Sequence, residues 1–157
     1  MRIEPATAAD LDAIHEIESH SFKVSWPRET FEAELAREWA RVDVLRAPAV
    51  IGFCNYWLVA PDHNRTGGEV HILSIGTHPD HRRTGIGAKL LAHALDGARA
   101  IGATLATLEV RRGNQPAIAL YERAGFRTVH VRARYYQDDG ADALVMLAEL
   151  TPPPDRR

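Results

Sequence analysis

Residues 82–89 read RRTGIGAK, and this short glycine-containing stretch decides how the chain on either side of it folds. It follows a strand-like segment, 69–77, that Pro79 stops, and it leads into residues 85–100, whose apolar side chains recur on one helical stripe. The first N–H groups of such a helix have no acceptor within the helix, so the stretch is a candidate anion site. By itself, a tight turn before an ordinary helix explains the two glycines equally well.

The glycine spacing excludes the commonest nucleotide-binding loops. A P-loop ends in Gly-Lys-Ser/Thr, whereas Gly87 is followed by Ala88. A dinucleotide fingerprint needs a third glycine where Leu90 stands. The candidate anion site therefore needs support from elsewhere in the chain.

Composition bounds the class of protein. With 157 residues, 45% hydrophobic and 25% charged, we expect one globular domain over residues 1–150 and a disordered Pro-rich tail at 151–157. No apolar run approaches the roughly 20 residues that span a bilayer, and the N-terminus lacks a signal-peptide pattern. A single cysteine, Cys54, fits a reducing cytosol. We therefore expect a cytoplasmic protein without a membrane segment.

The net charge of −2 is unevenly distributed. Residues 1–80 carry 13 acidic and 7 basic side chains, and residues 81–157 carry 8 acidic and 12 basic ones. The second half is the better neighbour for a phosphorylated ligand and the first half for a basic partner, but neither is basic enough to indicate nucleic acid. His78 and His81 flank Asp80, yet no second cluster supplies further ligands, so we expect no metal.

Hydrophobic periodicity and turn residues predict an α/β (α+β) fold with a mixed sheet of about six to seven strands and about four helices. Two helical crossovers indicate parallel strands at the centre of the sheet. We expect strands at 1–7, 42–45, 50–59, 69–77, 104–110, 127–136 and 143–150, a turn at 61–68, and helices from a cap at Thr7 or Asp10 to residue 21 and at 27–39, 85–100 and 116–124.

The loop belongs to a longer pattern. Arg82-x-x-Gly85-x-Gly87-Ala88 resembles the Q/R-x-x-G-x-G/A signature of the GCN5-related N-acetyltransferases (GNAT), whose loop binds the pyrophosphate of acetyl-CoA. The strand, loop and helix stand in the order of that family.

Two downstream blocks extend the resemblance over nearly the whole chain. LEVRRGNQPAIALYERAGF at 108–126 and ARYYQDDGADALVM at 133–146 are similar to the ribosomal-protein-alanine N-acetyltransferase group (RimI) within GNAT. Gly113 stands where that group usually has Ser, and SWP at 25–27 replaces its more familiar PWS.

The resemblance implies the GNAT fold, with the sheet splayed at its central parallel strands, and an acetyl-CoA site. The backbone at the end of strand 69–77 would bind the pantetheine and polarise the thioester carbonyl, and the loop would hold the pyrophosphate mainly through N–H groups. Gly76 suits a bulge in that strand. The implied cofactor-binding residues are Ile75, Gly76, Thr77, Arg82, Arg83, Thr84, Gly85, Ile86, Gly87, Ala88 and Asn114.

Glu109 is the candidate general base. Transfer of an acetyl group to an amine needs a neutral amine, and Glu109 is the only carboxylate of the apolar strand 104–110, where partial burial would raise its pKa. A surface ion pair with Arg111 or Arg112 is the plainer explanation. The surrounding block favours a base that acts directly or through water.

Tyr121 is the candidate general acid. It lies two helical turns after Asn114, so both residues share a face if Asn114 begins the helix. The resemblance places Asn114 on the pantetheine or phosphate arm and the Tyr121 hydroxyl beside the sulfur. Packing of the Tyr121 ring in the core is the alternative.

The resemblance implies an enzyme that acetylates a protein N-terminal α-amine, in the best-known case the N-terminal alanine of a ribosomal small-subunit protein. The residues that would contact the acceptor peptide are Trp26, Arg134 and Tyr135. The alternative is that their side chains only cover the surface of the sheet. An acetyltransferase for small amines or lysine side chains remains open. So does a non-catalytic CoA-binding module, although the presence of both Glu109 and Tyr121 argues against it.

Overall fold

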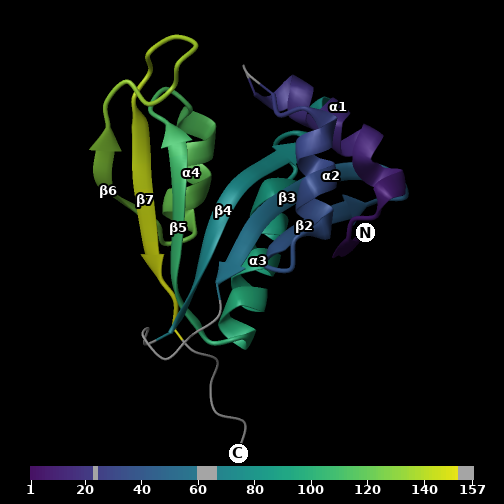
Figure 1. Cartoon of the computed structure of the whole chain (residues 1–157), viewed down its shortest axis with the longest axis horizontal. Helices are drawn as coiled ribbons and strands as arrows, with labels where there is room; N and C mark the ends of the chain where they lie inside the picture. The colour runs from purple at the N-terminus through teal and green to yellow at the C-terminus, as the bar shows by residue number, and fades with distance from the viewer. Residues whose placement is uncertain (23–24, 60–66, 152–157) are drawn as a thin grey trace, which may run out of the picture. The chain divides into compact units, whose positions relative to one another are not determined.

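The computed structural model describes residues 1–22, 25–59 and 67–151 (Figure 1). These residues form a seven-stranded sheet in the order β1-β2-β3-β4-β5-β7-β6, with four α-helices. β4 and β5 are parallel, whereas β1–β2, β2–β3, β5–β7 and β6–β7 are antiparallel. The expected mixed α/β fold is confirmed; the expected tail at 152–157 and most of the turn at 61–68 lie outside the described residues.

The elements follow the predicted order. Two short 3₁₀ turns, Ala8–Asp10 and Pro79–His81, precede α1 and the glycine loop. Within the described ranges, no helix is both long and apolar enough to cross a membrane. The elements are β1 Arg2–Pro5, α1 Leu11–Ser21, α2 Arg28–Ala36, β2 Ala40–Arg46, β3 Val50–Val59, β4 Gly68–Thr77, α3 Ile86–Ala100, β5 Ala103–Arg111, α4 Gln115–Arg123, β6 Arg127–Arg132 and β7 Ala143–Glu149.

Two predicted elements were too long. The helix expected at 27–39 ends at Ala36, because Arg37 has extended backbone angles. The strand expected at 127–136 ends at Arg132, because the chain turns and Arg134 takes a left-handed φ of 52°. Arg134 and Tyr135 consequently lie in the connection between β6 and β7, and the prediction that placed them on a strand was wrong.

The chain divides into two compact units: Met1–Trp57 with Leu73–Ala94, and Leu58–Ile72 with Leu95–Arg157. In the first unit the apolar stripe of α1, which Leu11, Ile14 and Ile17 form, packs in one core with Phe31 and Phe53. The rings of Phe31 and Phe53 meet edge to face with centroids 5.6 Å apart. Side chains from α1, α2, β2 and β3 therefore share this core.

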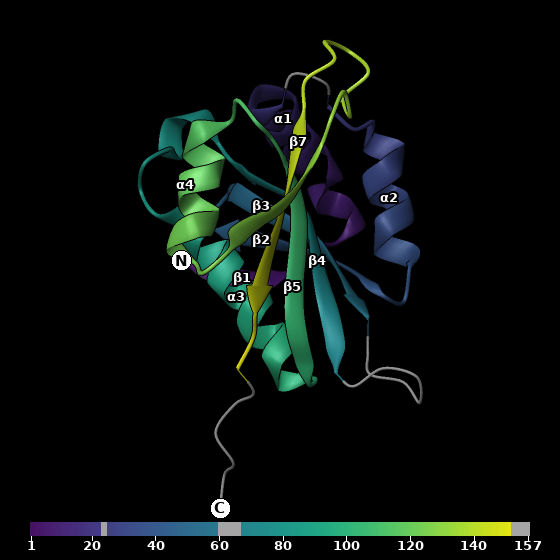
Figure 2. The ribbon, with the colours of Figure 1, turned by 90° about the vertical axis from the view of Figure 1, so that its left-hand side faces the viewer.

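In the second unit, β5 has a hydrogen-bonded strand on each side. It pairs in parallel with the first half of β4 and antiparallel with β7, and β7 pairs in turn with the edge strand β6. Figures 1 and 2 show α4 beside these strands. On β5, Ala106, Leu108 and Val110 are buried, whereas Thr107 and Glu109 are only half-buried.

Gly76, near the end of β4, is needed because a side chain would not fit there, and not because its backbone is left-handed. A Cβ at this position would lie 2.5 Å from Cε1 of Phe53 and 2.9 Å from Cγ2 of Ile17. The described register of β4 with β5 runs only from Gly68 to Ile72, so a bulge at Gly76 stays a prediction. Close packing against α1 and β3 thus explains the glycine.

We predict that Gly76→Ala lowers the free energy of unfolding by about 1–3 kcal/mol, because the added methyl group overpacks a filled core. The control is Gly97→Ala on α3, where a Cβ meets nothing within 4 Å. Alanine there should stabilise the protein by up to about 1 kcal/mol through helix propensity. Urea denaturation measures both, and an unchanged stability of Gly76→Ala would contradict the packing argument.

Candidate active site

The glycine loop in the first unit forms a sharp turn into α3. Arg83 and Gly85 have φ values of 64° and 80°, and α3 begins at Ile86. The N–H of Lys89 donates to the carbonyl of Gly85 at 3.1 Å, which is a bond of the first helical turn. The earlier N–H groups of the helix have no intrahelical acceptor, so the loop has the backbone geometry of an anion site.

Two side chains of the loop, those of Arg82 and Thr84, hydrogen-bond to backbone carbonyls of the protein. Arg82 donates from Nη2 to the carbonyl of His20 at the end of α1, at 2.8 Å. Thr84 donates its hydroxyl to the carbonyl of His81. Arg82 therefore ties the loop to α1, and the backbone remains the stronger candidate for phosphate binding.

Ile75, Gly76 and Thr77 close β4 in the same unit. The parallel pairing of β4 with β5 runs from Gly68 to Ile72, so these three residues follow its last paired residue. Ile75 and Thr77 are half-buried and Gly76 is buried. Their role in pantetheine binding stays a prediction.

Trp26 is held by a buried acid that sequence reasoning missed. Oε1 of Glu18, in the last turns of α1, accepts the backbone N–H of Trp26 at 3.2 Å, and the Trp26 ring packs on Phe31 with centroids 5.6 Å apart. Glu18 is 2% exposed, and its Oε2 has no hydrogen-bond partner within the described residues. Burial raises the pKa of Glu18 to about 7, although the Trp26 N–H opposes the shift. The signal was a carboxylate four residues after Ile14 on an apolar helical stripe.

Ionisation of Glu18 should cost stability as the pH rises. Because the pKa of Glu18 is raised in the folded state, its protonated carboxyl group stabilises the fold relative to an ionised one. This contribution is complete below the unfolded pKa near 4.5 and is lost as the pH passes about 7. We predict that, relative to Glu18→Gln, the free energy of unfolding of the wild type is about 2–3 kcal/mol lower at pH 8.5 than at pH 5, so that the wild type is the less stable at high pH.

Urea denaturation at the two pH values measures this difference. Glu16→Gln on the exposed face of α1 is the matched control and should run parallel to the wild type. A gap between wild type and Glu18→Gln that does not change with pH would show that Glu18 does not titrate in this range.

Glu109, the predicted base, lies in the second unit with two partners. On β5 it is paired with Val145 of β7, and its side chain is 23% exposed. Oε1 of Glu109 accepts Nη1 of Arg132 from β6 at 2.8 Å, and the carboxylate also takes part in a hydrogen bond with the Tyr135 hydroxyl. That hydrogen bond is the main cause that raises the pKa of Tyr135, with burial second. The residue therefore has an ion-pair partner, but not one that the sequence suggested.

The arginines proposed as alternative partners of Glu109 bind elsewhere. Arg111 pairs with Asp138 and Asp139, at 3.2 and 2.7 Å, and Arg112 pairs with Asp142 at 3.2 Å. The plainer explanation of Glu109 as a partner of Arg111 or Arg112 is thus wrong. Both arginines instead hold the connection between β6 and β7.

That connection carries two of the three residues predicted to contact the acceptor, Arg134 and Tyr135. The backbone N–H of Arg134 donates to Oδ1 of Asp142 at 3.1 Å. Tyr135 is 40% exposed, and the guanidinium carbon of Arg132 lies 4.4 Å from the centre of its ring. The structure therefore brings Tyr135 to Glu109, whereas a substrate role for Trp26, Arg134 and Tyr135 stays a prediction.

His71 on β4 is a further polar residue near Glu109 that sequence reasoning missed. It is register partner of Thr107, and its Nδ1 lies 2.9 Å from the Thr107 Oγ1. Burial lowers the pKa of His71, and the charges of Glu109 and Glu69 oppose that shift. Its proximity to Glu109 follows from strand pairing, which the sequence alone does not reveal.

Asn114 and Tyr121 occupy the two ends of one face of α4, as predicted. Asn114 is the N-cap, and its Oδ1 accepts the backbone N–H of Ala117 at 3.3 Å. Tyr121 is buried, and its ring meets Phe126 edge to face at 5.8 Å. Their capping and packing contacts are established, and their roles toward a cofactor stay predictions.

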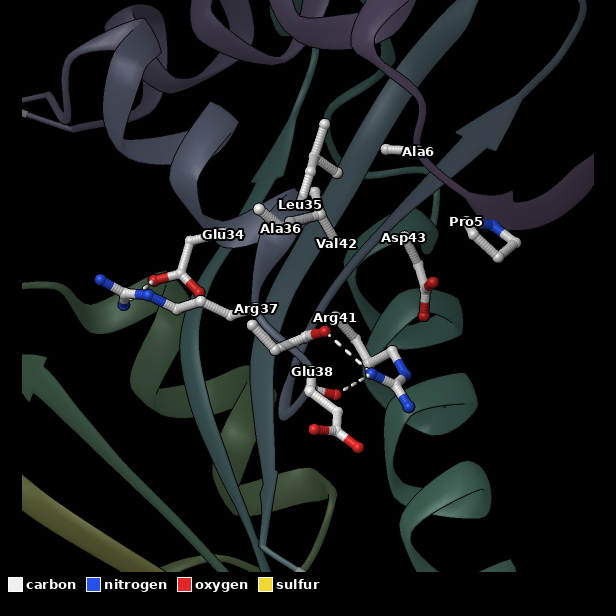
Figure 3. Close-up of a pocket in the computed structure, with 11 residues that line it drawn as sticks. Pro5, Ala6, Glu34, Leu35, Ala36, Arg37, Glu38, Arg41, Val42 and Asp43 are labelled. Atoms are coloured by element: carbon white, nitrogen blue, oxygen red, sulfur yellow. Dashed lines mark hydrogen bonds and ion pairs between the residues drawn. The ribbon is translucent and has the colours of Figure 1, made fainter.

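A groove of about 340 Å³ lies in the first unit, and none of the residues that line it is a predicted site residue (Figure 3). Its rim is mixed in charge: Glu34 pairs with Arg37 at 3.2 Å, and Arg41 donates to the backbone carbonyls of Glu38 and Ala40. Across the part of the chain that the structure describes, no three His, Cys, Asp or Glu side chains gather as metal ligands. The residues that line the groove are Pro5, Ala6, Glu34, Leu35, Ala36, Arg37, Glu38, Ala40, Arg41, Val42 and Asp43.

The chain is similar in sequence and in fold to known acetyltransferases. The sequence model of the Acetyltransferase (GNAT) family matches residues 11–126. The chain is 32% identical over 148 residues to a putative [ribosomal protein bS18]-alanine N-acetyltransferase of Bacillus subtilis, covering 93% of this chain and 90% of that protein. It is 30% identical over 151 residues to the [ribosomal protein bS18]-alanine N-acetyltransferase of Escherichia coli K12, covering 95% and 97%.

The crystal structure of the ribosomal-protein-S18-alanine N-acetyltransferase from Escherichia coli has the same fold. It superposes with a TM-score of 0.82 at 28% identity and covers 99% of this chain and 97% of its own. The chain therefore belongs to the GNAT acetyltransferase family. Within that family it is similar, over nearly its whole length, to the bS18-alanine N-acetyltransferases, which confirms the resemblance found in the sequence.

Proposed function

We propose that this protein transfers the acetyl group of acetyl-CoA to the N-terminal α-amine of a protein, and that this acceptor is the N-terminal alanine of a ribosomal small-subunit protein. The observation that carries the proposal is near-full-length similarity to the [ribosomal protein bS18]-alanine N-acetyltransferase of Escherichia coli and to the Bacillus subtilis protein named as a putative one. A cytoplasmic location is part of the proposal, since the chain has a single, buried cysteine.

Both backbone and side-chain groups of the protein bind acetyl-CoA in this proposal. The N–H groups at the start of α3 bind the pyrophosphate, assisted by the charges of Arg82 and Arg83. The backbone of Ile75 to Thr77 bonds the pantetheine and polarises the thioester carbonyl, and Asn114 bonds the same arm.

The chemical step needs one base and one acid. Glu109 accepts a proton from the acceptor ammonium, directly or through water, and the neutral nitrogen attacks the acetyl carbonyl carbon. The tetrahedral intermediate loses its second nitrogen-bound proton to water and expels the CoA thiolate, which takes a proton from the Tyr121 hydroxyl. An amide and free CoA result. The hydronium ion so formed returns a proton to the tyrosinate, and Glu109 releases its proton to solvent, so that one proton is released in each turnover.

An α-amine suits this site better than a lysine side chain does. Its pKa is about 7.7–8, compared with about 10.4 for lysine, so a carboxylate need remove its proton only from a mild acid. The acidic character of residues 1–80 further favours a basic peptide.

We predict that Glu109→Gln lowers kcat by about 10²-fold or more and Tyr121→Phe by about 10-fold or more, with acetyl-CoA binding unchanged, because each variant removes only a proton-transfer group. Release of CoA thiol measures turnover, and calorimetry measures acetyl-CoA binding. Glu122→Gln, an exposed carboxylate on α4, is the control.

The acceptor class is tested with the same assay on N-terminal peptides, free amines and lysine peptides. Peptides that begin with alanine should be the best acceptors, and Ala-Arg should react faster than Ala-Glu. Preference for a free amine or a lysine peptide would replace the proposed acceptor, and no thiol release with any acceptor would indicate a CoA-binding module.

A further inference from the structure

Glu109, Arg132 and Tyr135 form a closed set of contacts. Arg132 donates to the Glu109 carboxylate at 2.8 Å, the Tyr135 hydroxyl bonds the same carboxylate, and the Arg132 guanidinium stacks on the Tyr135 ring at 4.4 Å. Each residue thus contacts the other two. In the absence of an acceptor, the candidate base Glu109 is therefore paired with the positive charge of Arg132.

This arrangement matters because the acceptor arrives as a cation too. An α-amine with a pKa of about 7.7–8 is largely protonated at neutral pH, so Glu109 must first meet an ammonium group. Two cations that are close together repel each other, and they do so more strongly at a protein surface than in bulk water because the effective dielectric constant is lower. The ammonium and the guanidinium therefore compete for one carboxylate.

Arg132 is the partner that can give way. Its side chain is 48% exposed, compared with 23% for Glu109, and every residue of the edge strand β6 is exposed. A solvent-accessible ion pair of this kind contributes little to stability, so the acceptor can displace Arg132 at a small cost in free energy. Tyr135 is neutral and does not repel the ammonium, so its hydrogen bond can persist and keep the carboxylate oriented.

We propose that Arg132 is the resting counter-ion of Glu109, which the α-ammonium of the acceptor displaces, and that it is a positioning residue that sets acceptor affinity. The proposal rests on the proposed role of Glu109 as proton acceptor. It assigns Arg132 a function opposite to substrate binding: its charge occupies the place that the acceptor needs.

Removing Arg132 should leave the surrounding connection in place. Arg111 stacks on Tyr136 at 4.1 Å and pairs with Asp138 and Asp139, and Arg112 pairs with Asp142. These contacts hold the connection between β6 and β7 without using Arg132. A change in Arg132 therefore tests the competition for Glu109 rather than the folding of this segment.

The test compares Arg132→Gln with Arg127→Gln. Both remove one positive charge from β6, but Arg127 pairs with Glu149 at 3.6 Å and not with Glu109. For the best acceptor found in the thiol-release panel, we expect Arg132→Gln to lower KM about 2–5-fold, the factor that corresponds to about 0.4–1 kcal/mol, with kcat unchanged. Calorimetry with that acceptor and CoA should show the same gain in affinity, and Arg127→Gln should behave as the wild type.

Three results would overturn the proposal. A higher KM in Arg132→Gln alone would mean that Arg132 helps to bind the acceptor. An unchanged KM would mean that the pair does not compete, and an equal drop in Arg127→Gln would mean a general charge effect. Failure of the proposed acceptor is separate, since it appears in the acceptor panel as a preference for a free amine or a lysine peptide, whatever the KM of Arg132→Gln. Full activity of Glu109→Gln would remove the base role on which this proposal rests.

Discussion

The pairing of β5 on both of its edges is the constraint on which the candidate site depends. β4 fixes its register in parallel from Ala103 to Leu108, and β7 fixes it antiparallel from Leu105 to Arg111. Side chains alternate along a strand, so a slip by one residue would bury Glu109 and turn its apolar neighbours outward. The burial of Leu108 and Val110 opposes that slip. Hydrophobic packing on one face thereby sets the position of a carboxylate on the other.

Patterns that are local in sequence predicted much of this architecture. The alternation of apolar residues from 104 to 110 identified both β5 and Glu109, because burial on one face has a period of two residues. The cap at Asn114 and the spacing to Tyr121 were equally readable, since a helix places residues seven apart on one face. The glycine loop was predicted from its place before an apolar helical stripe.

Contacts between distant segments could not be predicted in this way. Arg132 reaches Glu109 only because β7 lies between β5 and β6, and no local pattern distinguishes it from Arg111 or Arg112. The left-handed backbone of Arg134 ended a strand that residue propensities would have continued. Glu18 did leave a trace, as an acid on an apolar stripe, but its bond to the Trp26 N–H depends on the path of the chain between α1 and α2. Such cases show that the sequence identified the candidate base more readily than the side chains that contact it.

The position of the acetyl group on the product tests the central claim most directly. A peptide that begins with alanine and contains an internal lysine offers both kinds of amine in one molecule. After incubation with the enzyme and acetyl-CoA, fragmentation in a mass spectrometer locates the added acetyl group. The account predicts acetylation of the N-terminal nitrogen with the lysine unmodified; acetylation of the lysine, or a peptide left unmodified while a free amine is acetylated, would contradict it.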